Sequence, residues 1–206
     1  KRGRLWLAWQ LLKYRIGLRV KSPYSLKDMA KDSIAVLDEL EIGEAHIIGA
    51  SMGGMIAQTV AYDFPERTRS LISIMSTTWA PHLPPPGREQ EQGISDMNES
   101  SAEQAENLEQ IGFYPTALPN QVTAILSGGD RTTQVRTIEA PTLVLHGADD
   151  ELLSVEHGKH TAEVISGAKL KIYKNMGHSL PDHVIPDMVN DILGHLSTKP
   201  KLASSE

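Results

Sequence analysis

The sequence predicts an α/β fold in which a parallel sheet of at least four strands is covered by helices. Short apolar runs without polar alternation, typical of strands buried on both faces, alternate along the chain with segments of helical periodicity. Parallel strands need long crossover connections, and helices at these intervals supply them. The 206 residues are 40% hydrophobic, which is enough for one sizeable core.

The composition excludes several classes of protein. A net charge of -6 offers no long-range attraction to phosphates, so we expect no nucleic-acid partner. The chain has no cysteine, which rules out disulfides and thiolate metal sites and is compatible with a reducing cytosol. No apolar run approaches the roughly 18 residues that a membrane-spanning helix needs. We therefore expect a cytoplasmic protein without a membrane span.

The N-terminal segment, residues 1–21, is basic and amphipathic. It contains seven basic residues and no acidic one, and its large apolar residues are Leu5, Trp6, Trp9, Leu12 and Ile16. A helix of this kind lies on a membrane surface in one interpretation. In the other, its Trp and Leu face packs on the domain and its charges stay in water. The net charge of this segment is +7 and that of the rest of the chain is -13. Packing of the helix on the domain is therefore electrostatically reasonable, and we favour this interpretation.

The next elements lead to a serine. Ser25 and Asp28 form a capping-box-like start, and apolar residues at helical spacing then continue to Gly43. The short apolar run 46–50 predicts a buried strand, and Ser51 follows it directly. A helical pattern over 54–64 ends at Pro65. The run 71–75 predicts the next strand.

The second half of the chain opens with a break in this rhythm. Residues 79–135 begin with prolines and continue with a polar, acidic stretch, so they predict a small helical cap or lid. The alternation of strands and helices then resumes. We predict strands over 142–146 and 170–173 and helices around 155–165 and 184–196. We therefore divide the chain into a core of residues 1–78 and 136–206 and a cap insertion of residues 79–135.

The motif Gly49-Ala50-Ser51-Met52-Gly53 lies between a predicted strand and a predicted helix, the context that gives GxSxG its meaning. A serine on such a tight turn has a strained backbone, and small residues around it let strand and helix approach. Gly49, Gly53 and Gly54 meet that need. The sequence thus predicts Ser51 as a nucleophile, with the N–H of Met52 as an oxyanion donor.

A serine nucleophile needs a histidine base, and the base needs a carboxylate to orient it. His178 lies in a loop just past the last strand, at the edge where catalytic loops of parallel sheets collect. His46 and His146 lie in strands and are expected to be core histidines. Both Asp149 and Asp150 follow the third strand. Nucleophile, acid and histidine then stand in the order of an α/β-hydrolase, with gaps of 99 and 28 residues when Asp150 is the acid.

From Tyr24 to about Leu196 the chain resembles α/β-hydrolases, and is similar to esterases of the aclacinomycin methylesterase-like, or carboxylesterase, family. The stretches that carry the resemblance are residues 46–58, Phe64-Pro65-Glu66-Arg67, residues 141–147 and Gly177-His178. The family pattern GxxD, starting at Gly147, implies Asp150 as the acid and Asp149 as a loop residue.

The chain also departs from the family. An intact member has further strands before Tyr24 and a His-Gly-like loop that supplies a second oxyanion donor. Without that donor we expect a rate about a hundredfold to a thousandfold lower. The strand at 46–50 then has one unpaired edge, which invites pairing with other strands. We expect a portion upstream of Lys1 to complete the sheet, with a homodimer through this edge as the alternative.

These observations predict a serine esterase that acts on a small-molecule ester and needs no cofactor and no metal. Trp79, Met97 and Phe113 would line an apolar substrate pocket, although plain core positions are the alternative. His157 and His160, one helical turn apart, have no third ligand and do not predict a metal site. A cofactor-free haloperoxidase, a carbon–carbon bond hydrolase, and an inactive fragment or interaction module without the oxyanion loop are the rival functions.

Overall fold

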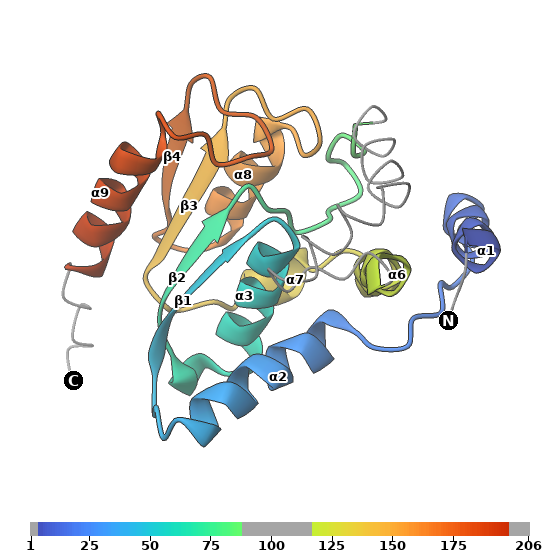
Figure 1. The fold of residues 1–206 in the computed structure, drawn as a ribbon, viewed down its shortest axis with the longest axis horizontal. Coiled ribbons are helices and arrows are strands. Elements are labelled where there is room, and N and C mark those ends of the chain that lie inside the picture. Colours follow the sequence, from blue (N-terminus) through green and yellow to red (C-terminus); the bar gives the residue numbers. More distant parts are fainter. Residues whose placement is uncertain (1–3, 88–116, 198–206) are drawn as a thin grey trace, which may run out of the picture.

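The computed structural model describes residues 4–87 and 117–197, and it confirms the predicted α/β architecture (Figure 1). Its four strands form one sheet in the order β1-β2-β3-β4, with every neighbouring pair parallel. In chain order the elements are α1 (Arg4–Arg15), α2 (Leu26–Glu39), β1 (Ala45–Ala50), α3 (Met52–Asp63), the short 3-10 helix Pro65–Arg67, β2 (Thr68–Ile74), α6 (Leu118–Gly128), α7 (Thr132–Val135), β3 (Thr142–Gly147), α8 (Val155–Val164), β4 (Lys169–Tyr173) and α9 (Ile185–Leu196).

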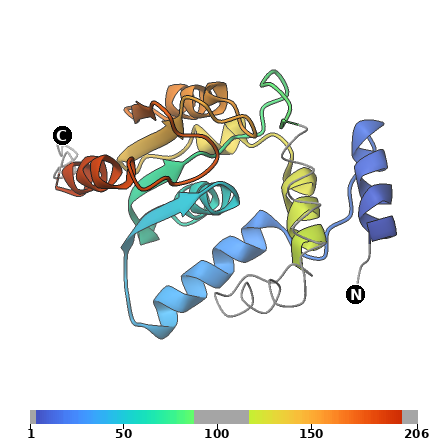
Figure 2. The same ribbon diagram turned by 45° about the horizontal axis from the view of Figure 1, so that its top comes forward.

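Helices cover both faces of the sheet, and each face has its own apolar core (Figures 1 and 2). On one face, α9 buries Met188 against Ile72 and Leu145 of the central strands. On the other face, α3, α7 and α8 pack around Leu71, and α2 packs on the outside of α3. Successive side chains of a strand point to opposite faces, so neighbours such as Leu71 and Ile72 serve different cores.

Local signals explain where α2 begins. The Ser25 hydroxyl accepts a hydrogen bond from the N–H of Asp28, and the Asp28 carboxylate accepts one from the N–H of Ser25. This is the capping box predicted from the sequence, and it satisfies amides that have no partner inside the helix. The helix then buries Ala30 and Ile34 against α3.

Strand β1 is not buried on both faces, and that part of the prediction is wrong. β1 ends the described sheet, and α9 does not extend over it, so Ile48 is 49% exposed. The side chain of His46 is also exposed, with its Nδ1 2.8 Å from the hydroxyl of Ser70, so His46 is not a core histidine. Apolar residues on a strand therefore do not by themselves establish burial. The unpaired edge of β1 agrees with the expectation from the sequence.

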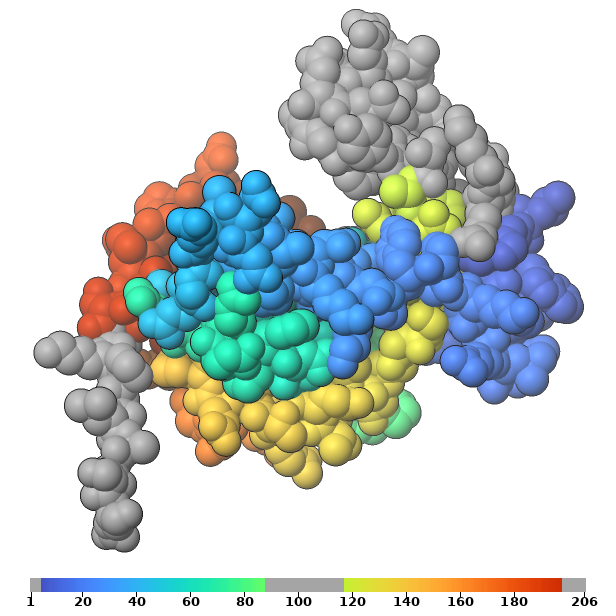
Figure 3. Space-filling model, turned by 90° about the horizontal axis from the view of Figure 1, so that it is seen from below, coloured from blue at the N-terminus to red at the C-terminus, as the bar shows by residue number. Residues whose placement is uncertain are grey.

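Helix α1 forms where the sequence predicts a helix, but most of its predicted packing face is exposed. Leu5 is 90% and Trp9 55% exposed, and Leu12 and Ile16 are exposed as well. The helix packs beside α6 at one end of the molecule (Figure 3) and lies away from the sheet (Figure 1). The preferred interpretation, in which this face packs on the domain, is therefore wrong. Within residues 4–87 and 117–197, no helix has the length and apolarity to cross a membrane.

Candidate active site

Ser51 occupies the sharp turn between β1 and α3. Its backbone has φ 53° and ψ -120°, a conformation that residues with side chains rarely adopt. Its N–H donates to the carbonyl of Ile74 over 2.9 Å, and its own carbonyl accepts from the Ser76 hydroxyl over 2.9 Å. Both partners belong to the end of β2 and the residues just after it, so the neighbouring strand holds the strained peptide at both ends.

The glycines around Ser51 differ in what they contribute. A Cβ on Gly49 would overlap the carbonyl of Gly53, and a Cβ on Gly54 would lie 2.5 Å from the Cβ of Ser76. These two positions therefore need glycine for close approach. A Cβ on Gly53 would meet nothing within 4 Å, so the prediction that Gly53 meets the same steric need is wrong.

His178 lies in the loop after β4 and connects two side chains that are far away in sequence. Its Nε2 is 2.8 Å from the Ser51 hydroxyl oxygen, and its Nδ1 is 2.8 Å from Oδ2 of Asp150. Because a carboxylate only accepts, Nδ1 carries the proton and Nε2 presents a lone pair to the hydroxyl. Since β1, β3 and β4 run parallel, the three side chains lie at the same edge of the sheet, where the strands end.

Asp150 is held in place by the loop that follows β3. The side chain is buried, and its Oδ1 accepts hydrogen bonds from the N–H groups of Leu152 (3.0 Å) and Leu153 (2.9 Å). Burial by itself would raise the pKa of Asp150. Hydrogen bonds from His146, His178 and the N–H of Leu153 outweigh burial and hold this pKa well below its usual range. Asp150 is therefore a carboxylate throughout the neutral range.

Of the two adjacent acids, Asp150 contacts the histidine. Asp149 is exposed, and its N–H donates to the carbonyl of Met176 over 3.0 Å, which ties the loop after β3 to the loop after β4. The family pattern thus selected the residue that lies beside His178.

His146 supports the acid in a way that the sequence did not reveal. It is fully buried, and its Nε2 is 2.8 Å from the carbonyl of Leu153, as expected for a core histidine bonded to the backbone. The same nitrogen lies 3.4 Å from Oδ2 of Asp150. Since a carbonyl only accepts, Nε2 carries a proton, which also points at the carboxylate. In the sequence, only the four-residue separation between His146 and Asp150 hinted at this contact.

Arg131 is a second residue that sequence reasoning missed. It is 4% exposed, and its guanidinium donates to Oε1 of Gln58 over 3.0 Å and to the carbonyls of Met55 and Thr77. These contacts fasten the helix that follows Ser51 to the segment that follows β2. Arg131 lies in the region expected to be a cap, and its sequence neighbours gave no hint that it is buried.

The expected oxyanion and substrate residues are placed only in part. Met52 is the first residue of α3, and the first amides of a helix have no acceptor inside it, so its N–H suits a developing oxyanion. Trp79 is half-buried, and its indole Nε1 donates to the Tyr14 hydroxyl over 2.9 Å. Met97 and Phe113 lie outside the described residues. A role for Trp79 in a substrate pocket stays a prediction.

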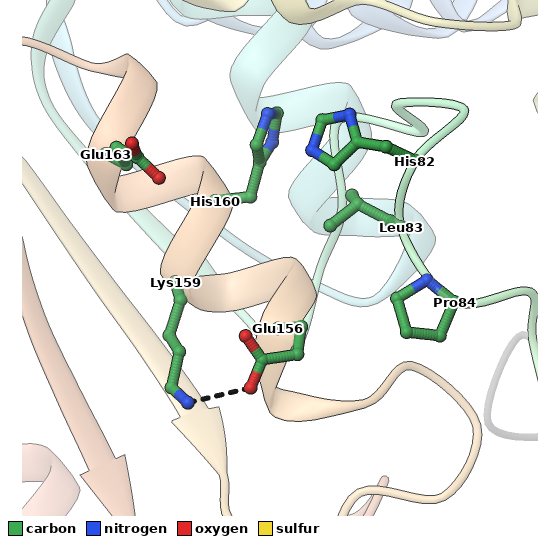
Figure 4. Close-up of a pocket in the computed structure, with 7 residues that line it drawn as sticks. All are labelled: His82, Leu83, Pro84, Glu156, Lys159, His160 and Glu163. Atoms are coloured by element: carbon green, nitrogen blue, oxygen red, sulfur yellow. Dashed lines mark hydrogen bonds and ion pairs between the residues drawn. The ribbon is translucent and has the colours of Figure 1, made fainter.

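A cavity of about 240 Å³ lies away from these residues, between α8 and the loop after β2 (Figure 4). It is smaller than typical ligand sites and contains none of the three proposed catalytic residues. Polar and apolar groups both line it, and Lys159 and Glu156 form an ion pair of 2.7 Å on its wall. The residues around it are His82, Leu83, Pro84, Glu156, Lys159, His160 and Glu163.

His157 and His160 do not face a common metal position. Nδ1 of His157 is 2.7 Å from the Thr77 hydroxyl, and Nδ1 of His160 is 3.0 Å from the Thr78 hydroxyl. In the part of the chain that the structure describes, no three His, Asp or Glu side chains are grouped so that they could hold a metal ion.

Comparison with known proteins identifies the class. A family model described as alpha/beta hydrolase fold matches residues 9–104. A solved hydrolase from Pseudomonas aeruginosa PA01 superposes with a TM-score of 0.64 at 24% identity, covering 86% of this chain and 74% of that one. By sheet order, by the strand–serine–helix turn and by these matches, this chain has the alpha/beta hydrolase fold.

Two relatives of known activity are similar to this chain in sequence. Rhodomycin D methylesterase of Streptomyces sp. (strain C5) is 24% identical over 219 residues, which cover 84% of this chain and 74% of the relative. A 2-hydroxy-6-oxononadienedioate/2-hydroxy-6-oxononatrienedioate hydrolase of Pseudomonas sp is 27% identical over 177 residues, which cover 72% of this chain and 62% of the relative. The chain thus spans 62% to 74% of the length of these two hydrolases.

Proposed function

We propose that this chain is a serine hydrolase that cleaves carboxylic esters through an acyl-enzyme on Ser51. The observation that carries the proposal is the unbroken series of hydrogen bonds from the Ser51 hydroxyl through His178 to the buried Asp150, each 2.8 Å long. A nucleophile, a base and an acid in these positions form the arrangement that acyl transfer requires.

In the first half of the reaction, the Ser51 oxygen attacks the ester carbonyl carbon while Nε2 of His178 takes the hydroxyl proton. The negative charge that develops on the carbonyl oxygen is stabilised by the N–H of Met52. Asp150 stabilises the imidazolium that forms and keeps Nδ1 protonated. The tetrahedral intermediate then collapses, and His178 returns its proton to the departing alcohol oxygen.

In the second half, the same groups release the acid. Nε2 of His178 takes a proton from water, and the resulting hydroxide oxygen attacks the acyl carbon on Ser51. Collapse of this second intermediate breaks the bond to Ser51, and His178 returns the proton to the serine oxygen. The products are a carboxylic acid and an alcohol, and no redox step or cofactor is involved.

Hydrolysis of a short-chain p-nitrophenyl ester tests the proposal. We expect wild-type turnover to fall to the background rate in Ser51→Ala. The matched control is Ser33→Ala on the exposed face of α2, where the hydroxyl bonds only the carbonyl of Met29. This control should hydrolyse the ester like the wild type. A wild type no faster than Ser51→Ala would overturn the proposal and favour an inactive fragment or an interaction module.

Carbon–carbon bond hydrolysis is the second candidate, because the 2-hydroxy-6-oxononadienedioate hydrolase and a 2-hydroxy-6-oxo-6-phenylhexa-2,4-dienoate hydrolase are both relatives. The same serine and histidine can serve it, so the three side chains do not separate the two reactions. A comparison of turnover on p-nitrophenyl butyrate and on a 2-hydroxy-6-oxo-dienoate does. Faster turnover of the dienoate would replace the ester assignment.

A further inference from the structure

Helix α1 presents an apolar stripe to solvent. Spacings of four, three and four residues place four large apolar residues on one face, three within the helix and Ile16 directly after it. The N–H of Ile16 still donates to the carbonyl of Leu12. All four residues are exposed, by 47% to 90%: Leu5, Trp9, Leu12 and Ile16. Large exposed apolar groups that gather in one place mark an interaction surface, unlike single ones scattered over a protein.

Contacts on the other side of the helix hold the stripe outward. Gln10 is 3% exposed, and its side-chain oxygen accepts from the N–H of Lys21 over 2.8 Å. One turn later, the Tyr14 hydroxyl accepts from the indole of Trp79. The helix also packs beside α6 (Figure 2). The stripe is therefore the free face of a docked helix.

Positive charge borders the stripe on both sides. At 100° per residue, Lys13 and Arg15 lie about a quarter turn to either side of it. Residues 1–21 contain no acidic residue to offset the charge. An apolar face that contains a Trp and is flanked by Lys and Arg is the pattern of a helix that lies in the interface of an anionic bilayer.

We propose that α1 binds the surface of an anionic lipid membrane and brings the site at Ser51 to esters dissolved in that membrane. Its 12 residues span about 18 Å, so it lies on the bilayer and does not cross it. A second copy of the chain is a poorer occupant, because two stripes face to face would bring their flanking cations together. The statement about esters rests on the proposed function, whereas the membrane contact does not.

The helix is connected to the site through the segment after β2. Trp79, which holds Tyr14 of α1, donates its N–H to the Thr77 hydroxyl over 2.8 Å. Thr77 follows Ser76, whose hydroxyl holds the carbonyl of Ser51. A membrane under α1 would thus lie beside the segment that positions the nucleophile. The implied substrate class is an ester with a long apolar acyl or alcohol part.

Cosedimentation of the full chain with vesicles tests the membrane contact. We expect binding to vesicles of phosphatidylcholine mixed with phosphatidylserine, weaker binding in high salt, and little binding to phosphatidylcholine alone. The double variant Trp9→Glu/Leu12→Glu should lose at least tenfold in partitioning. The matched control is Val189→Glu/Leu193→Glu on α9, which adds the same charge at residues 46% and 55% exposed and should bind like the wild type.

Three further results separate the possible outcomes. Ser51→Ala should sediment like the wild type, because the contact needs no catalysis. Wild-type chain that stays in solution with anionic vesicles overturns the proposal, as does a Trp9→Glu/Leu12→Glu variant that binds unchanged. A dimer in size-exclusion chromatography with light scattering that this variant converts to monomer assigns the stripe to a second copy and also overturns it.

The ester statement has its own readout. The α1 variant should slow hydrolysis of a long-chain p-nitrophenyl ester in anionic vesicles at least tenfold and leave p-nitrophenyl acetate in water unchanged. Wild type that binds vesicles but hydrolyses neither ester would refute the proposed function and leave the membrane contact standing. Equal loss on both esters would refute the substrate class.

Discussion

Two pairs of histidines lie on neighbouring elements but have different partners. His178 and His146 surround the buried carboxylate of Asp150, and His178 also reaches the Ser51 hydroxyl. The pair on α8, His157 and His160, bonds to threonine hydroxyls, and His157 also bonds to a backbone carbonyl. A carboxylate beside a histidine orients the ring and stabilises the imidazolium that forms when the ring takes a proton. The comparison thus explains why we propose proton transfer for His178, support of Asp150 for His146 and a structural role for the pair on α8.

The largest expected effect comes from removing the charge of that carboxylate. Asp150→Asn should lower kcat for a p-nitrophenyl ester by about 10⁴-fold, because an amide NH2 beside Nδ1 favours the wrong tautomer of His178. Asp149→Asn is the matched control next door, and it should stay within about twofold of the wild type because Asp149 is exposed. Similar losses in both variants would mean that Asp150 has no special role in proton transfer.

A smaller effect should follow from crowding the point where α8 meets His146. A Cβ on Gly158 would lie 2.5 Å from Nδ1 of His146, so Gly158→Ala should displace that ring from Asp150. We expect a loss of about 1–3 kcal/mol in unfolding free energy by urea denaturation, together with a lower kcat.

The control for this change is Gly194→Ala on α9, where a Cβ meets nothing within 4 Å. Because alanine favours a helix over glycine, it should raise stability by up to about 1 kcal/mol. Destabilisation by both substitutions would indicate that the first loss is a general effect of replacing a glycine in these helices, and not the result of contact with His146.

The smallest effect concerns pH. Burial lowers the pKa of His157 from its ordinary value of 6.5, so the folded state favours the neutral ring. The unfolded chain therefore binds more protons below pH 6.5, and this contribution to stability is present above that pH and is lost as the pH falls. Asp150 stays ionised in this window, because its pKa is depressed.

We expect His157→Gln to lose less unfolding free energy than the wild type between pH 7.5 and about pH 5.5. Urea denaturation at both pH values measures the difference. Burial also lowers the pKa of His160 and His195, so these residues contribute to the pH dependence of the wild type as well. The difference between the wild type and His157→Gln isolates the contribution of His157. An identical pH dependence would show that His157 gains no stability from being neutral.

Local sequence patterns predicted much of this molecule. Ser25 and Asp28 form the capping box that they indicated, and the four strands occur where apolar runs stand between helical patterns. The chain order of serine, acid and histidine selected the three side chains that the structure brings together. These features follow from short-range periodicity or from a motif whose geometry is local.

Burial and support were harder to predict, because they depend on neighbours from elsewhere in the chain. Ile48 in β1 and Trp9 in α1 look like core residues by type, yet nothing in the described chain covers them fully. Gly53 and Gly54 are adjacent glycines that the sequence does not distinguish, but of the two only Gly54 faces the Ser76 side chain. Arg131 is buried by contacts with residues more than fifty positions away.

The amino-acid order alone determined the alternation of strands and helices, the strained serine turn and the identity of the three side chains that we propose as catalytic, since each depends on residue type and spacing along the chain. The tertiary structure decided which histidine supports the acid, which glycine is essential and which face of α1 remains in water. Those outcomes depend on distances of a few ångströms between segments that are remote in sequence, and no local pattern encodes such distances.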